Sequence, residues 1–229
     1  MGALLAARIV ISEVGELYDY RALRQLRDAT MFVLDPQRRI AVLGARQSSD
    51  LLDPVALGGV SLRRRRGGGG LVLLQPGDLW IDFWIPADDA RWTYDVHFSA
   101  LMVGEWWRRV LAPRVDGDVV VHTGSLEGDE RHRVVCFAGR GPGEVFVDGH
   151  KAVGVTQWRV REGVFLSSVV HAHSSSNLID LLFERPPGLA DALNHLVVSS
   201  FGGLNLDTVV EELCAMSGPW RVSSLTMPL

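Results

Sequence analysis

The chain is a succession of short apolar runs separated by glycine, proline and aspartate, which is the pattern of β-strands joined by tight turns. Residues 35–37 (Asp-Pro-Gln) are predicted to form a turn between two such runs, and at residues 76–78 (Pro-Gly-Asp) we expect a strand, a turn and a returning strand. The runs predicted as strands are 8–12, 31–34, 40–43, 60–64, 71–74, 79–84, 119–121, 134–137, 144–147, 152–159 and 164–170.

The clearest helical pattern covers residues 93–111, where apolar side chains recur every four positions from Phe98 to Val110. Thr93 or Asp95 is suited to the N-cap of this helix. Trp106 is expected in the core and Trp107 on the helix surface. Shorter helices are predicted for residues 17–29, 186–196 and 207–216, and a helical turn for residues 50–54.

The order of these elements predicts an α+β fold. Strands follow one another as neighbours and helices are inserted singly, which favours a mixed, mostly antiparallel sheet flanked by helices. The 229 residues are 47% hydrophobic, include seven tryptophans and show no linker of biased composition. We therefore expect one domain, residues 1–229, with a single large core.

Charge and apolar runs limit the classes of partner. A formal net charge of −4 argues against general affinity for nucleic acid, and no aromatic residue interleaves with the arginines of residues 63–66. No apolar run is long enough to span a bilayer, and Arg8 interrupts the N-terminal apolar segment. The two cysteines, Cys136 and Cys214, are far apart, which favours a reducing compartment. We expect a cytoplasmic protein that binds neither nucleic acid nor membrane.

The candidate chemistry lies in two segments. Residues 63–70 are four arginines followed by four glycines, between two predicted strands. Glycines let a ligand approach the backbone closely, and arginines donate to phosphate or carboxylate oxygens. Lys151, the single lysine of the chain, follows an Asp148-Gly149 turn. Together these segments predict a site for an activated acid or a nucleotide. The alternatives are a flexible glycine connector and an ordinary solvated lysine in a hairpin.

The glycine run matches neither of two common nucleotide-binding motifs. No Gly-Lys-Ser/Thr closes it, as a phosphate-binding loop requires, and a predicted strand follows it where a dinucleotide fingerprint needs a helix. Its position between two apolar strands still favours a functional loop over a connector.

Three segments, in this order, resemble the lipoate–protein ligases. Residues 64–72, Arg-Arg-Arg-Gly-Gly-Gly-Gly-Leu-Val, resemble the family's Arg-Arg-x-Ser-Gly-Gly-Gly-Ala-Val motif. Residues 147–159 resemble its second motif, Val-Asn/Asp-Gly-x-Lys-x-x-Gly-x-x-Gln-x-Arg, and residues 39–44 resemble the strand before the first motif. The resemblance extends from about residue 39 to residue 182 and is specific for the superfamily of biotin and lipoate protein ligases and octanoyltransferases.

This resemblance implies the class II synthetase-like catalytic fold of biotin and lipoate ligases. It implies an enzyme that uses ATP with Mg²⁺ to activate lipoate, or a related medium-chain acid, as an acyl-adenylate. The acyl group then passes to a lysine of a lipoyl-carrier domain or of a glycine-cleavage-type carrier protein. The resemblance makes Lys151 the catalytic residue, in contact with the phosphate and the acyl carbonyl, and assigns no protein ligand to a metal. The residues implied in binding ATP and the acyl-adenylate are Arg64, Arg65, Gly68, Gly69, Gly70, Leu71, Val72, Asp148 and Gly154.

The sequence departs from the family pattern at two places. Gly67 replaces the serine before the glycine triplet, and Leu74-Gln75 replaces the usual His-Asp pair. The second departure leaves open a non-catalytic relative that binds an acyl group or a carrier domain. No counterpart of the C-terminal accessory domain of two-domain ligases is recognised, so a separate accessory subunit supplies it or the enzyme works without it.

An octanoyl or lipoyl acyltransferase that does not use ATP is the second alternative, because such enzymes share the fold and the lysine. They carry the acyl group on a cysteine thiolate, which must be activated and partly exposed. Cys136 is expected in a buried strand and Cys214 in a packed helix, so neither suits this role well. Biotin ligase ranks third, because its motif alternates glycine with arginine.

His171 and His173 would share one face of a strand and could bind a metal. No third ligand is evident, and the serines that follow favour a surface turn. Asp82 and Asp148 are candidates for contact with magnesium or for a turn.

Overall fold

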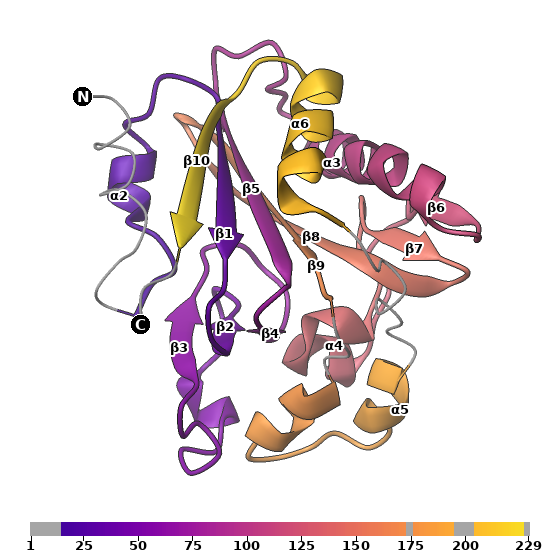
Figure 1. Ribbon diagram of the computed structural model, residues 1–229. Helices are drawn as coiled ribbons and strands as arrows, with labels where there is room; N and C mark the ends of the chain where they lie inside the picture. Colours follow the sequence, from indigo (N-terminus) through magenta and orange to yellow (C-terminus); the bar gives the residue numbers. More distant parts are fainter. Residues whose placement is uncertain (1–14, 173–175, 195–203, 227–229) are drawn as a thin grey trace.

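The computed structural model describes residues 15–172, 176–194 and 204–226 of the chain. A seven-stranded sheet forms its centre, in the order β10-β1-β5-β9-β8-β7-β6 (Figure 1). Neighbouring strands are antiparallel except β1 and β10, which are parallel. The strands are β1 (Thr30–Asp35), β5 (Leu79–Pro86), β6 (Val119–Val121), β7 (Val145–Val147), β8 (His150–Val160), β9 (Gly163–Val170) and β10 (Arg221–Thr226).

A smaller sheet carries the first candidate segment. Its order is β3-β2-β4, with β3 parallel and β4 antiparallel to β2. The bounds are β2 (Ile40–Leu43), β3 (Ser61–Arg64) and β4 (Val72–Leu74). The four glycines therefore lie in the connection from β3 to β4.

Helices cover the large sheet and close its lower end. The helix α3 (Val96–Leu111) packs against α6 (Leu206–Ser217) on one face (Figure 1). The shorter helices are α2 (Tyr20–Leu23), α4 (Glu130–Val134) and α5 (Leu189–Asn194), with 3-10 turns η1 (Ser49–Leu51), η2 (Ala112–Arg114), η3 (Cys136–Ala138) and η4 (Ser176–Leu181). Within the described residues, no helix is both long and apolar enough to cross a membrane.

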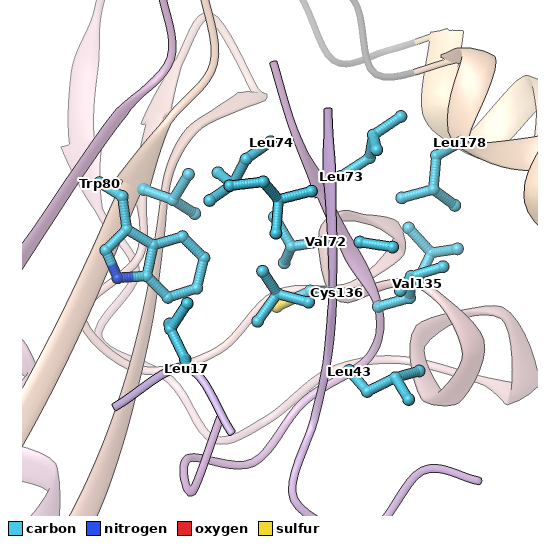
Figure 2. Packing of buried hydrophobic residues seen from close by; sticks show 14 of the residues in the cluster. Leu17, Leu43, Val72, Leu73, Leu74, Trp80, Val135, Cys136 and Leu178 are labelled. Atoms are coloured by element: carbon cyan, nitrogen blue, oxygen red, sulfur yellow. The ribbon is translucent and has the colours of Figure 1, made fainter. Parts of the chain in front are cut away.

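Two apolar cores lie on opposite faces of the large sheet, as the alternation of side chains along a strand requires. In β1, Met31 and Val33 belong to the core beneath α3 and α6, whereas Phe32 and Leu34 belong to the core shared with the small sheet. Figure 2 shows the core shared with the small sheet, in which Val72 of β4 lies beside Cys136, and Leu73, Leu74, Trp80 and Leu178 belong to the same cluster. The predicted fold class, a mostly antiparallel sheet flanked by helices, is confirmed.

Several local predictions were wrong because tertiary packing decided them. Residues 134–137, predicted as a strand, form the end of α4 and the turn η3, and α2 is a single turn in place of a helix over residues 17–29. The strand after residues 76–78 does not return along the strand before them, because the two lie in different sheets, whereas the two strands predicted around residues 35–37 are confirmed. The predicted strand 8–12 and the end of the predicted helix 186–196 lie outside the described residues.

The buried face of α3 also differs from its prediction. Trp107 is fully buried with Trp106, whereas Phe98 is 56% exposed. Asp95 is the N-cap, since its side chain accepts a hydrogen bond from the Phe98 amide. The periodicity thus located the helix correctly but misplaced its apolar face by about one residue. The edge strand β10 was not predicted.

Candidate functional site

The four glycines and Leu71 form a loop, residues 67–71, that runs against two other backbone segments. A Cβ on Gly44 would lie 2.0 Å from the Gly69 carbonyl oxygen, and a Cβ on Gly70 would lie 2.6 Å from the Cys136 nitrogen. The Leu71 amide donates to the Val134 carbonyl at 2.8 Å, and the Cys136 amide donates to the Leu71 carbonyl at 3.1 Å. Close backbone packing therefore requires glycine at positions 44 and 70.

Arg65 supports this glycine loop from beneath. Its buried guanidinium donates to the carbonyls of Gly68 (2.8 Å), Gly70 (2.7 Å) and Val42 (3.1 Å). Burial lowers the pKa of Arg65. Arg64 donates to the carbonyls of Gly44 and Gln47. Both arginines thus bind backbone oxygens, which gives them a clear part in shaping the loop.

Lys151 lies on β8 with its side chain buried in the protein. Its Nζ is 2.7 Å from Glu144 Oε2 and 3.0 Å from the Cys136 carbonyl oxygen, and it lies 5.2 Å from the centre of the Phe137 ring. The Lys151 and Glu144 side chains are only 2% and 3% exposed. Since Cys136 also bonds to Leu71, one short segment joins the lysine to the glycine loop. The two sequence segments therefore meet at η3.

Glu144 is the residue of this cluster that the sequence reasoning missed. It follows Gly141-Pro142-Gly143 and accepts a hydrogen bond from the Gly141 amide at 2.6 Å. Burial raises the pKa of Glu144, while Lys151 and the amides of Gly141 and Val155 oppose that shift. A lone glutamate directly after a glycine-rich turn, a few residues before the single lysine, was the available signal.

Four other predicted site residues take structural positions. Asp148 has φ 49° in the turn between β7 and β8, and its carboxylate accepts the Asp118 amide at 2.9 Å. A Cβ on Gly154 would lie 3.0 Å from the Phe137 ring, so glycine gives that ring its place beside Lys151. Leu71 and Val72 are buried in the core.

His171 also packs against Phe137, with its ring centre 4.6 Å from that of Phe137. Its Nδ1 is 2.9 Å from the buried Asp78 carboxylate, so this histidine has a structural partner. His173 lies outside the described residues. In the part of the chain that the structure describes, no group of three His, Cys, Asp or Glu side chains could hold a metal ion.

Asp82 is fully buried within the protein. Its carboxylate accepts hydrogen bonds from the Tyr18 hydroxyl and, at 2.8 Å, from the Trp80 indole. Burial raises the pKa of Asp82 to about 7. Asp82 is thus part of a buried polar network beneath the large sheet.

A cavity of about 550 Å³ opens at the glycine loop. Gly68 and Gly69 form part of its wall, and two arginines, Arg46 and Arg133, face it from other segments. His132 also lines it, and its pKa is lowered by burial and then by the charge of Lys151. The lining residues are Arg46, Gln47, Gly68, Gly69, Leu126, Gly128, Asp129, His132 and Arg133.

None of these charged lining residues was predicted from sequence, because residues 134–137 were predicted as a strand and residues 128–133 were left without a structure.

A second cavity, of about 570 Å³, lies between the end of α2 and the β8–β9 turn, and contains none of the predicted site residues.

No protein-family model and no curated protein matches the sequence. Solved structures do match. Lipoate-protein ligase A bound with ATP is 15% identical with a TM-score of 0.65, covering 97% of this chain and 83% of that one. The bi-partite lipoate protein ligase of Thermoplasma acidophilum, studied with its E2 lipoyl domain, is 16% identical with a TM-score of 0.63, covering 89% and 78%. LipL1 of P. falciparum in complex with lipoate is 12% identical with a TM-score of 0.54, covering 87% and 54%. The chain therefore has the fold of the lipoate–protein ligases.

Proposed function

We propose that this protein is a lipoate–protein ligase-like enzyme that activates lipoate, or a related medium-chain acid, with ATP. The observation that carries the proposal is the meeting of Lys151 and the glycine loop at Cys136. In the first step, the carboxylate of the acid attacks the α-phosphorus of ATP and pyrophosphate leaves. In the second, the amine of a carrier-protein lysine attacks the acyl carbonyl and AMP leaves.

This chemistry needs positioning and cations rather than a protein nucleophile. Lys151 would donate to the α-phosphate and to the acyl carbonyl, in both steps. Gly68 and Gly69 would let the ligand approach the loop backbone, while Arg46 and Arg133 would face the polyphosphate in the cavity. Arg64 and Arg65 would act by holding the loop in shape. Mg²⁺ would enter with ATP.

Solved structures of the same fold support the choice of ligands. One contains ATP, and that of protein Ta0514 of T. acidophilum contains lipoic acid. The T. acidophilum ligase is described as bi-partite, which supports a separate accessory subunit here as well. We propose a lipoyl-carrier domain or a glycine-cleavage-type carrier protein as the acceptor.

Acid-dependent exchange between ATP and labelled pyrophosphate tests the first step. We expect exchange with lipoate or octanoate, and a loss of roughly 100-fold or more in Lys151→Ala. Since that variant leaves Glu144 buried without its partner, it can fail to fold. The double variant Lys151→Met with Glu144→Gln removes both charges, and should fold yet show no exchange. Tight binding of the acid without exchange in the wild type would instead support a non-catalytic relative.

A specific observation favours one alternative, acyl transfer without ATP. Cys136 lies beside the site rather than in a strand, since its carbonyl accepts from Lys151 and its Sγ is 3.1 Å from the Cβ position of Gly69. In this reaction the Cys136 thiolate would attack an acyl thioester and release the donor thiol, and the acceptor lysine would then displace Cys136. Transfer from octanoyl-carrier protein without ATP, lost in Cys136→Ser but kept in Cys214→Ser, would support it.

A further inference from the structure

Glu144 is the carboxylate nearest to the catalytic candidate, and the fold holds it firmly. Gly143 and Gly104 allow the loop before Glu144 to pack directly on α3, since a Cβ on Gly104 would lie 2.2 Å from the Gly143 carbonyl oxygen. Glu144 Oε2 then accepts the Gly141 amide at 2.6 Å. The carboxylate position is thus determined by backbone contacts rather than by a flexible side chain alone.

The strand that carries Lys151 is irregular at the same place. The pairing of β7 with β8 shifts register between Val145 and Phe146, and Phe146 is opposite Lys151. Irregularities of this kind redirect a side chain relative to a regular strand. Lys151 consequently points into the protein, where Glu144, one residue before β7, receives it.

The pairing with Glu144 limits the directions in which the Lys151 amine can donate hydrogen bonds. An ammonium group has three N–H donors. Glu144 takes one of them at 2.7 Å and the Cys136 carbonyl takes another at 3.0 Å. The orientation of the third N–H is then determined, because two bonds and the Phe137 ring hold the amine. A buried amine without a carboxylate beside it would also lose its proton more readily.

We infer that Glu144 is the positioning residue of Lys151: it keeps the amine charged and holds it so that one N–H is left unbonded for a ligand. This inference rests on the proposed function for the identity of that ligand. The other groups near the amine do not replace Glu144. His132 on α4 is a potential cation, and Cys136 contributes a neutral carbonyl.

The chain offers a direct test, because Lys151 is its single lysine. Labelling with ¹⁵N-lysine therefore places one Nζ signal in the NMR spectrum, and its shift reports whether the amine is protonated. The wild-type protein gives the reference pH at which the ammonium signal converts to that of a neutral amine. In Glu144→Gln the conversion to a neutral amine should move down by about two pH units. Glu105→Gln is the matched control, since Glu105 pairs with Arg108 and Arg109 on the outer face of α3.

Activity gives the second measurement. Glu144→Gln should lower the maximal rate of pyrophosphate exchange by roughly 100-fold at pH 8, with a smaller loss at pH 6 and little change in KM for ATP. Glu144→Asp keeps the charge but retracts it by one methylene, so its amine should stay protonated while exchange falls at every pH. If Glu144→Gln does not fold, the Nζ titration and the exchange rate of Glu144→Asp test the inference.

The inference would be overturned if the Nζ titration of Glu144→Gln equalled that of the wild type. It would also be overturned if Glu144→Asp exchanged pyrophosphate at the wild-type rate. Failure of the proposed function is a different result, because it shows as absent exchange in the wild type. The Nζ titration remains readable in that case, and tests the charge-holding role of Glu144 separately.

Discussion

Two alanine substitutions in the glycine loop should separate folding from ligand binding. Gly68 is exposed on the cavity, and a Cβ there meets no atom within 4 Å. Gly70 is buried, and a Cβ there lies 2.6–2.7 Å from three backbone atoms of Val135 and Cys136. An added methyl group therefore meets no other atom at position 68 but clashes with the backbone at position 70.

The expected stabilities follow from this geometry. Gly68→Ala restricts the unfolded chain without strain, so the free energy of unfolding should rise by about 0.5 kcal/mol. Gly70→Ala must move two backbone segments apart by roughly 0.8 Å to restore normal contact, which costs about 1–3 kcal/mol or more. Urea unfolding of both variants measures these differences. Gly58→Ala is a control, because a Cβ there makes one ordinary contact of 3.6 Å.

Gly68→Ala, which is expected to gain stability, should nevertheless lose activity. The Gly68→Ala methyl group occupies the space through which a ligand would approach the loop backbone. A misplacement of about 1 Å typically costs on the order of 100-fold in rate, so pyrophosphate exchange should fall by that amount in a fully folded protein. Calorimetric titration with ATP should show weaker binding. Wild-type exchange and ATP affinity in Gly68→Ala would refute the assignment of this loop to the ligand site.

Other substitutions test the network around the site. Because burial raises the folded-state pKa of Asp82 to about 7, the native state retains a proton that the unfolded state loses, so stability should fall as pH rises from about 4 to 7. Asp82→Asn should remove this decline, which is worth up to about 4 kcal/mol in full and roughly 3 kcal/mol between pH 5 and pH 8, where urea unfolding measures it; parallel pH profiles of the two proteins would contradict it. Arg65→Lys should lower the free energy of unfolding by roughly 2 kcal/mol, because one ammonium cannot reach the carbonyls of Gly68, Gly70 and Val42 together; unchanged thermal unfolding would argue against this role. Lys151→Met should unfold at lower urea than the double variant Lys151→Met with Glu144→Gln, since the single change leaves one buried charge unpaired; the reverse order would show that Glu144 is neutral in the folded protein.

The sequence determined those features that depend on local pattern. Apolar patterns located the strands of both sheets apart from β10, and the four-residue repeat located α3, because burial of one face imposes these periods. The glycine run and the single lysine identified the two segments that meet at η3, because glycine and lysine there have no close chemical substitute. Residues 134–137 were misassigned, since a short apolar run suits a buried strand and a buried helical turn equally well.

Tertiary structure alone decided how these segments combine. The strands on either side of residues 76–78 enter different sheets, because pairing partners are chosen by packing across the whole core rather than by the intervening turn. Trp107 is buried because both the large sheet and α6 pack against α3. The helical periodicity of the sequence does not reveal which elements pack against the helix. Glu144 became part of the site through the register shift opposite Lys151 and the contact of Gly104 with Gly143. A one-residue change in register reverses which side of a strand a side chain faces, so the partner of Lys151 depends on three-dimensional contacts that the order of residues does not display.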